Sequence, residues 1–138
     1  MVPALLIPSN RIKDPFLGFN ELECEWVGEK SWTYKVELPA VSKSSAGTRH
    51  VLAFDGLDTF ATVKLDGETI LKSDNMFIYH SVDVTEKLKT GTGSVLEIEF
   101  KPALAEAQKV KDAHPEHKWV GFNGDMARLA VRKAQYHL

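Results

Sequence analysis

Hydrophobic and polar residues alternate with a period of two along most of this chain. In residues 32–38, the apolar side chains of Trp32, Tyr34, Val36 and Leu38 are separated by polar ones. Successive side chains of a strand point to opposite faces, so this pattern predicts a strand with one buried face and one solvated face. Further strands are predicted in residues 51–54, 60–74, 77–84 and 94–100, and a last alternation runs through residues 128–132.

Residues 60–74 are predicted to form a hairpin of two short strands. Asp66 and Gly67 separate the two apolar runs, and an Asp-Gly pair readily adopts the positive φ angles that a two-residue hairpin turn requires. The alternation then directs the side chains of Ala61, Val63 and Leu65 toward the core.

One helix is predicted in residues 103–113, which are rich in helix-forming residues and are followed by Pro115. We expect it to lie across the sandwich and to bury Leu104, Ala107 and Val110, or a face close to it.

Residues 85–91 predict a shorter helical turn, with Thr85 as its N-cap and Gly91 at its end. Strands separated by turns rather than by crossover helices are typical of an antiparallel β-sandwich. The sequence therefore predicts an all-β fold with one short helix near the C-terminal end. The polar residues 42–47 are expected to be a long hairpin loop.

Composition narrows the functional classes. The length of 138 residues is typical of one domain, and its 17 basic residues are interspersed with 19 acidic ones. Nucleic-acid binding is not expected, because phosphate recognition needs a concentrated basic face. Residues 4–7 form too short an apolar run for a signal peptide or a membrane span. Cys24 is the only cysteine, which favours a reducing, intracellular compartment.

Sequence motifs for phosphate loops, serine nucleophiles and zinc proteases are absent, so we predict no cofactor and no metal site. His114 and His117 have a ligand-like spacing, but Pro115 interrupts the helix that would direct them to one point, and no third ligand was expected nearby.

Two other groups of residues allow alternative interpretations. Asp55 and Asp58 are either an acid–base pair or, as we favour, turn residues that bond to the local backbone. Trp119 and Phe122 precede an Asn-Gly-Asp stretch, and such aromatic rings either stack on a sugar or cover the edge of a core.

Five segments follow one another in a specific order along the chain. They are "DPFLGFNE" (14–21), "EWVGEKSW" (25–32), "FDGLDTFATVKLDGETIL" (54–71), "SDNMF" (73–77) and "VRKAQYH" (131–137). Together they resemble the N-terminal domain of β-mannosidases of glycoside hydrolase family two, particularly the fungal intracellular type. The signature positions that carry the resemblance are Asp14, Pro15, Asn20, Glu21, Asp55, Gly56, Asp58, Asp66, Gly67, Asp74, Asn75 and Met76.

The resemblance implies a jelly-roll sandwich of the galactose-binding-domain type. It also implies a parent enzyme that hydrolyses terminal, non-reducing β-D-mannose with retention, through two carboxyl groups about 5–5.5 Å apart. In the family these groups belong to a downstream α/β barrel, so no residue of this chain is assigned a catalytic role. We expect the domain to pack against that barrel and help shape the pocket for β-mannosides or mannose-containing oligosaccharides. The candidate substrate-side residues are Trp119, Asn123, Asp125, Gln135, Tyr136 and His137.

In the family, the segment similar to "KAQYH" continues into a Trp-Asp-Trp loop, a closing strand, immunoglobulin-like domains and the barrel. Residues 1–138 are therefore expected to be one jelly-roll domain that lacks its last strand and these domains. The segment before Asp14 is shorter than in the family and lacks its His-x-x-Leu motif. The alternatives are a free-standing carbohydrate-binding module and the equivalent domain of a β-galactosidase or β-glucuronidase.

Overall fold

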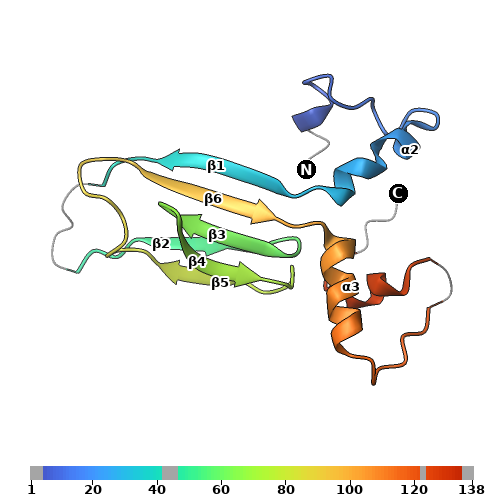
Figure 1. The fold of residues 1–138 in the computed structure, drawn as a ribbon. Helices are drawn as coiled ribbons and strands as arrows, with labels where there is room; N and C mark the ends of the chain where they lie inside the picture. Colours follow the sequence, from blue (N-terminus) through green and yellow to red (C-terminus); the bar gives the residue numbers. More distant parts are fainter. Residues whose placement is uncertain (1–4, 42–46, 122–123, 135–138) are drawn as a thin grey trace.

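The computed structural model describes residues 5–41, 47–121 and 124–134. Its strands gather at one end of the molecule and its helices at the other (Figure 1). The elements, in chain order, are α2 (Asn20–Cys24), the 3₁₀ helix η1 (Glu25–Glu29), β1 (Trp32–Leu38), β2 (Val51–Phe54), β3 (Ala61–Leu65), β4 (Glu68–Ser73), β5 (His80–Asp83), β6 (Ser94–Phe100), α3 (Ala103–Ala113) and the 3₁₀ helix η2 (Met126–Ala130).

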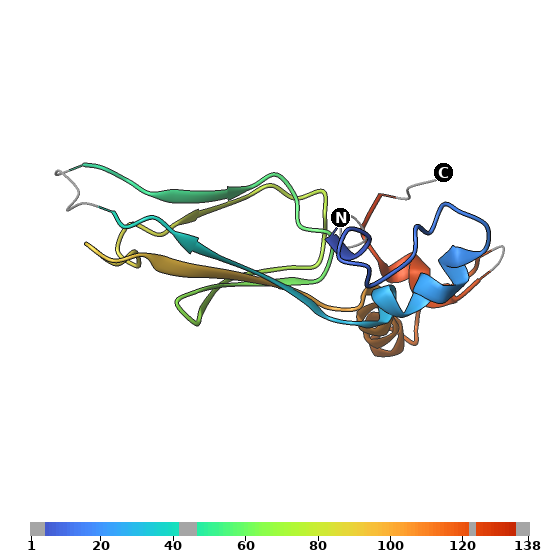
Figure 2. The same cartoon turned by 90° about the horizontal axis from the view of Figure 1, so that it is seen from above.

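The strands form two antiparallel sheets that lie as separate layers (Figure 2). One sheet has four strands in the order β1-β6-β3-β4, and the other pairs β2 with β5. The predicted antiparallel sandwich with one longer helix is therefore confirmed. Strand β5 is shorter than the predicted residues 77–84.

The core lies on the inner face of β3. Ala61, Val63 and Leu65 are buried, with Val63 fully inaccessible, as the alternation predicted. Leu57 and Leu96 complete the buried centre of this cluster. Because β3 is paired on both sides, its backbone groups are satisfied by β4 and β6 while its apolar side chains leave water.

The predicted hairpin turn is also confirmed. Asp66 and Gly67 have φ angles of 49° and 86°, as a type I′ turn requires. The Asp66 Oδ1 atom accepts a hydrogen bond of 2.8 Å from the backbone N–H of Val95. This bond, together with the nearby Lys89 ammonium group, holds the pKa of Asp66 below its ordinary value.

Strand β1 follows its predicted alternation only in part. Lys35 and Glu97 form a cross-strand ion pair of 2.8 Å on the solvated face, as the polar pattern indicates. Val36, expected to face inward, is 52% exposed. β1 is an edge strand, and the opposing sheet has only two strands to cover it.

Helix α3 has the predicted bounds but lies beyond the strand ends rather than across the sandwich (Figure 1). Ala107 is fully buried and Val110 is half-buried, so the helix buries a face close to the predicted one; Leu104 itself is 44% exposed, and its predicted burial was wrong. The buried stripe runs through Ala103, Ala107 and Val110, which packs the helix on η2 and η1 and turns the neighbouring Leu104 outward. None of the helices within the described ranges has the length and hydropathy to cross a membrane.

The predicted helical turn is present but shorter than residues 85–91: the backbone N–H of Leu88 donates to the Val84 carbonyl at 3.0 Å and closes a single turn. The Thr85 hydroxyl donates to Asp83 at 2.6 Å and accepts from the backbone N–H of His50 at 2.9 Å. It is therefore engaged between strands and does not act as a helix N-cap.

Two further expectations were wrong. The connection from β1 to β2 is not a hairpin, because the two strands belong to different sheets; its residues 42–46 lie outside the described ranges. The alternation in residues 128–132 does not form a strand, because Asp125 caps η2 by accepting from the backbone N–H of Ala127 at 2.9 Å. Only Arg132 then pairs with a neighbour, in a single parallel bridge to Asn75.

Candidate functional site

The signature segments that are distant in sequence converge where the strands meet the helical end. Gly56 packs directly on the loop at residues 73–77, since a Cβ atom at this position would lie only 2.3 Å from the Met76 carbonyl oxygen. Any larger residue would push the two backbones apart. Glycine is thus required here by close approach rather than by its φ angle.

The loop at residues 73–77 in turn holds the C-terminal described segment. Asp74 forms an ion pair of 2.7 Å with Arg132, and the backbone N–H of Met76 donates to the Arg132 carbonyl at 3.0 Å. The Asn75 Oδ1 atom accepts from the backbone N–H of Phe77 at 3.0 Å and so shapes the loop itself. The signature residues Asp74, Asn75 and Met76 therefore act together as a docking loop.

Asp58 lies on the other side of the same junction. Its carboxylate accepts from the hydroxyl of the adjacent Thr59 and lies 3.3 Å from Lys133 Nζ. Asp55 and Asp58 are both exposed. These contacts of Asp58 are to side chains rather than to the local backbone, so the turn interpretation of the two aspartates stays a prediction.

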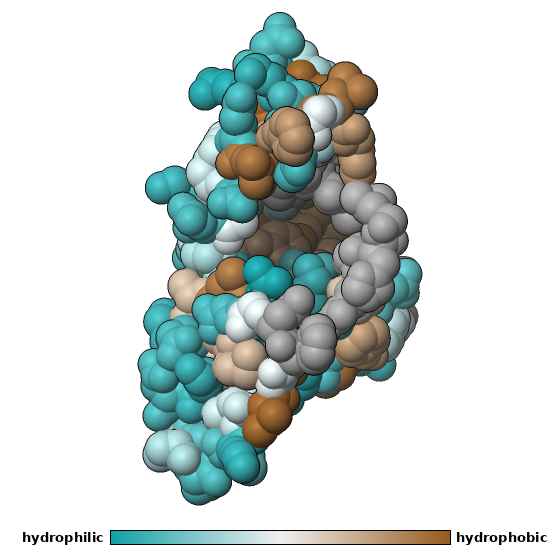
Figure 3. Space-filling model, turned by 90° about the vertical axis from the view of Figure 1, so that its right-hand side faces the viewer, coloured by the Kyte–Doolittle hydropathy of each residue, from teal (hydrophilic) through white to brown (hydrophobic). Residues whose placement is uncertain are grey.

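A groove with a volume of about 720 Å³ opens at this junction. Seen from the helical end, the molecule is hollowed and the floor of the hollow is apolar (Figure 3). Its aromatic walls come from the neighbouring strands β1 and β6, where the rings of Tyr34 and Phe100 meet edge to face with centroids 5.9 Å apart. The other lining residues include Trp32, Ile98, Gly56, Met76, Lys30, Lys101, Asp58 and Lys133.

The chemistry of the groove suits binding rather than bond cleavage. Aromatic faces flanked by a few charged groups are the surfaces on which sugar rings stack. Among the described residues that line it, Asp58 is the one carboxylate, and it is paired with Lys133. Retaining glycoside hydrolysis needs a second carboxyl group about 5–5.5 Å from the first.

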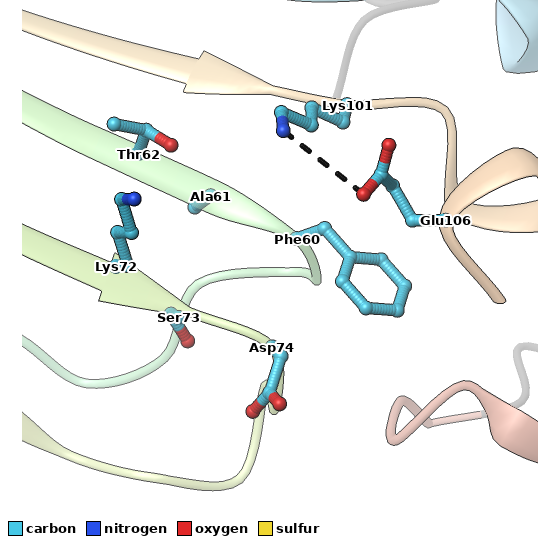
Figure 4. Close-up of a pocket in the computed structure, with 8 residues that line it drawn as sticks. All are labelled: Phe60, Ala61, Thr62, Lys72, Ser73, Asp74, Lys101 and Glu106. Atoms are coloured by element: carbon cyan, nitrogen blue, oxygen red, sulfur yellow. Dashed lines mark ion pairs between the residues drawn. The ribbon is translucent and has the colours of Figure 1, made fainter. Parts of the chain in front are cut away.

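A second, more polar hollow of about 410 Å³ lies where β3 and β4 approach the start of α3 (Figure 4). The side chains of Lys101 and Glu106 point toward one another, with 4.0 Å between Lys101 Nζ and Glu106 Oε2. Glu106 also pairs with Lys109 at 2.6 Å. Because the charged groups of Lys101, Glu106 and Lys109 pair with one another, they are less available to a ligand. The groove is therefore the better candidate site.

Two of the predicted substrate-side residues lie in the described part of the chain. Trp119 is half-buried, and its Nε1 atom donates to the His114 carbonyl at 3.4 Å. Asp125 is the cap of η2. The remaining candidates, Asn123, Gln135, Tyr136 and His137, lie outside the described residues. Neither Trp119 nor Asp125 lines the groove.

The remaining signature residues have structural contacts elsewhere. Asp14 Oδ1 accepts from the backbone N–H of Phe16 at 3.0 Å, and Asn20 Nδ2 donates to the Asp14 carbonyl at 2.9 Å. Between them, Pro15 is half-buried, while Glu21 is exposed on α2. Asp66 and Gly67 form the turn at the end of β3 that lies away from Asp58.

A family model described as glycosyl hydrolase 2 galactose-binding domain-like matches residues 2–138. The chain belongs to this family. The resemblance recognised in the five segments and the galactose-binding-like fold are thereby confirmed.

Individual members of the glycosyl hydrolase 2 family show how far the similarity extends. A Beta-mannosidase B from Aspergillus terreus is 54% identical over 134 residues, which are 96% of this chain and 16% of that protein. A Beta-mannosidase B from Emericella nidulans is 56% identical over 131 residues, 94% of this chain and 15% of that protein. The chain therefore spans about a sixth of the length of these curated relatives.

Solved structures agree with this grouping. The crystal structure of a Beta-D-Mannosidase from Dictyoglomus thermophilum superposes with a TM-score of 0.83 and 31% identity, over 95% of this chain and 16% of that one. An exo-chitosanase from Amycolatopsis orientalis superposes with a TM-score of 0.58 and 26% identity, over 72% of this chain and 12% of that one.

Sequence reasoning identified the segments of the junction but not the groove. The aromatic residues Trp32, Tyr34 and Phe100 were assigned to an inward face, and all three line the groove. Lys133 was not singled out at all. Its position beside the signature residues Gly56, Asp58 and Met76 depends on contacts between distant segments, which the recognised segment at residues 131–137 does not reveal on its own.

Proposed function

We propose that this chain is the non-catalytic N-terminal domain of a retaining β-mannosidase, which hydrolyses terminal, non-reducing β-D-mannose residues. The observation that carries the proposal is the 54% identity to a Beta-mannosidase B over 96% of the chain. The similarity to a Beta-D-Mannosidase structure over 95% of the chain supports it independently. In this proposal the nucleophile and the acid–base carboxyl groups belong to a catalytic barrel that follows the domain.

We assign to the groove the role of shaping the rim of the sugar pocket. Its aromatic walls and its Asp58–Lys133 pair supply an apolar surface beside fixed charges. Stacking and directional hydrogen bonds of this kind orient a sugar without reacting with it. Trp119 and Asp125 remain candidate substrate-side residues on a neighbouring segment.

A separate surface suits contact with the catalytic barrel. The segment that leads into and forms α2 carries four apolar side chains that are more than 60% exposed, namely Phe16, Leu17, Phe19 and Leu22. Apolar surface of this kind commonly marks a contact with another domain. We propose that this segment packs on the barrel in the whole enzyme.

The first experiment compares the 138-residue chain with the full-length enzyme on chromogenic aryl β-mannosides and β-galactosides. We expect turnover by the full-length enzyme only, with a preference for the mannoside, and mannose binding by the isolated chain no tighter than about millimolar. Turnover by the isolated chain, or a preference for the galactoside, would contradict the proposal. Submillimolar mannoside binding by the isolated chain would instead favour a carbohydrate-binding module.

The second experiment tests the barrel contact in the full-length enzyme with Phe19→Asp. We expect this change to lower the melting temperature and the activity together, because it places a charge in an apolar interface. The matched control is Val36→Asp, which charges an exposed apolar residue on β1. Equal losses of melting temperature and activity in the two variants would contradict the proposal that the α2 segment packs on the barrel.

A further inference from the structure

Three side chains of ligand type gather immediately after α3. His114, Glu116 and His117 each offer one ligand atom, and these three atoms lie within 4.8 Å of one another. The Nδ1 atom of His114 is 2.9 Å from Glu116 Oε1. The two imidazole rings are stacked with their centroids 5.6 Å apart. All three residues are exposed, so solvent reaches them directly.

The backbone explains why these groups meet. The N–H of His117 donates to the His114 carbonyl at 3.1 Å, which closes a four-residue turn with Pro115 in its second position. Proline is favoured at that position because its fixed φ matches the turn. The sequence argument that Pro115 would keep the two histidines apart was therefore wrong: the proline ends the helix and brings them together.

The turn is also anchored at its first residue. The backbone N–H of His114 donates to the Lys111 carbonyl at 3.2 Å, at the end of α3. The His114 carbonyl accepts from Trp119 Nε1 at 3.4 Å as well as from His117. The turn is thus hydrogen-bonded both to the helix and to the segment that follows. Because its backbone is already ordered, less conformational entropy is lost when the three side chains bind one ligand.

We propose that His114, Glu116 and His117 form a binding site for a zinc ion. Two imidazole nitrogens and one carboxylate oxygen are a donor set that zinc accepts, with bonds of about 2.0–2.2 Å and water in the fourth position. Ligand atoms bound at such distances lie about 3–3.5 Å apart in a tetrahedral site. The three ligand atoms lie within 4.8 Å of one another, and rotation of the exposed side chains can bring them to these distances.

Zinc at this turn would connect the end of α3 to the segment that holds Trp119. The His117 ring meets the Trp119 ring edge to face, with centroids 5.8 Å apart. Binding would therefore restrict Trp119 without requiring any contact between Trp119 and the metal. This inference does not depend on the proposed glycosidase function.

The test is a calorimetric titration of the purified 138-residue chain with zinc chloride. We expect one zinc ion per chain, and at least a tenfold loss of affinity in His114→Ala and in His117→Ala, because the loss of a direct ligand costs no less than the loss of an outer partner. Glu116→Gln should also weaken binding. The matched control is His50→Ala, which removes an imidazole distant in sequence and should leave the affinity unchanged.

A second readout separates this site from nonspecific binding to histidines. Bound copper quenches nearby indole fluorescence, and imidazole sites accept copper as well as zinc. We expect copper to quench the Trp119 emission, and the quenching to be lost in Trp119→Phe and in His117→Ala. Trp26 and Trp32 contact each other near β1 and provide the unquenched background.

Absence of zinc binding would overturn the proposal. So would equal losses of affinity in His50→Ala and His114→Ala, or quenching that survives Trp119→Phe. Circular dichroism of each variant shows whether it is folded. If an alanine variant unfolds, His117→Gln, which keeps a polar side chain of similar size, replaces it in the same titration.

Discussion

Strand β3 and the segment that follows β6 bury their side chains by different means. In β3, every second residue is buried and both edges of the strand are paired. In the later segment, Ala107 of α3 and Ala127 of η2 are the hydrophobic residues that are fully buried among those described. That segment is attached to the rest through individual contacts such as Asp74 with Arg132. A periodic core distributes its stability over many contacts, whereas a junction of single contacts depends on each of them.

The change expected to have the largest effect is Val63→Asp in the centre of β3. A charge without a partner at a fully buried position should lower the free energy of unfolding by about 4 kcal/mol or more. Val36→Asp is the matched change on the same sheet, and at 52% exposure it should cost about 1 kcal/mol or less. Urea denaturation of both variants measures the difference, and similar midpoints would mean that β3 is not the centre of the core.

The helical end should respond to Ala107→Asp with a smaller loss, about 3 kcal/mol. Ala107 is fully buried in α3, but the surrounding apolar cluster is smaller than that around Val63. The control is Leu104→Asp, where the side chain is exposed and the loss should stay below about 1 kcal/mol. Thermal melting distinguishes the two. A larger loss of stability in Leu104→Asp than in Ala107→Asp would indicate that Leu104 does lie on the buried face of α3.

The hairpin turn offers a test of backbone conformation alone. Gly67→Val should destabilise the domain by about 1–2 kcal/mol, because a β-branched residue resists the positive φ angle found there. Apart from its two neighbours in the chain, no described residue has an atom within 4 Å of the Cβ position, so steric contact does not contribute. Gly67→Asn should cost less, since asparagine tolerates positive φ. Equal losses for Val and Asn in chemical denaturation would contradict this explanation.

The smallest expected effect is a pH dependence that involves β5. The hydroxyl and backbone N–H of Thr85 and then the guanidinium of Arg49 hold the pKa of Asp83 well below its ordinary value. A lowered folded-state pKa contributes stability above about pH 4, and this contribution is lost as the pH falls through the folded-state pKa. Asp83→Asn should therefore lower the melting temperature at pH 7, and its difference from the original protein should narrow below about pH 4.

Arg49→Gln provides the control for this pH effect. It removes the ion pair with Asp83 but leaves both hydrogen bonds from Thr85. We expect it to retain part of the pH dependence. A difference between Asp83→Asn and the original protein that is constant from pH 7 to pH 2.5 would show that the Asp83 charge does not matter.

The same contrast explains which features were predictable from the sequence. Alternation directly encodes burial in a strand, so the hairpin and the inward positions of Ala61, Val63 and Leu65 were predicted correctly. The buried face of α3 depends on where η1 and η2 lie, and these are determined by distant contacts. Ala107 and Val110 were predicted on this face, but Ala103 takes the place of Leu104, because its smaller side chain allows the closer approach of neighbouring elements.

In the candidate site, too, some residues were predictable from the sequence and others depend on contacts between distant segments. Asp58, Asp74 and Met76 were recognised in the sequence through their order along the chain. In the structure Asp58 and Met76 line the same groove, and Asp74 pairs with Arg132. The aromatic groove walls were expected in the core, because the pattern shows that a side chain points inward but not whether the opposing layer is wide enough to cover it. The alternation in residues 128–132 was misleading because one capping side chain, that of Asp125, redirects the backbone into a helical turn.

The strand order β1-β6-β3-β4 also has a consequence for the order in which this protein assembles during synthesis. Both neighbours of β6 precede it in the chain, and its register joins Phe100 to Trp32 on one side and to Ala61 on the other. A chain emerging from the ribosome can close the β3–β4 hairpin early, because that contact is local. β1 must remain unpaired until residues 94–100 have been made, which leaves its apolar residues open to chaperones while the segment between the two strands is synthesised.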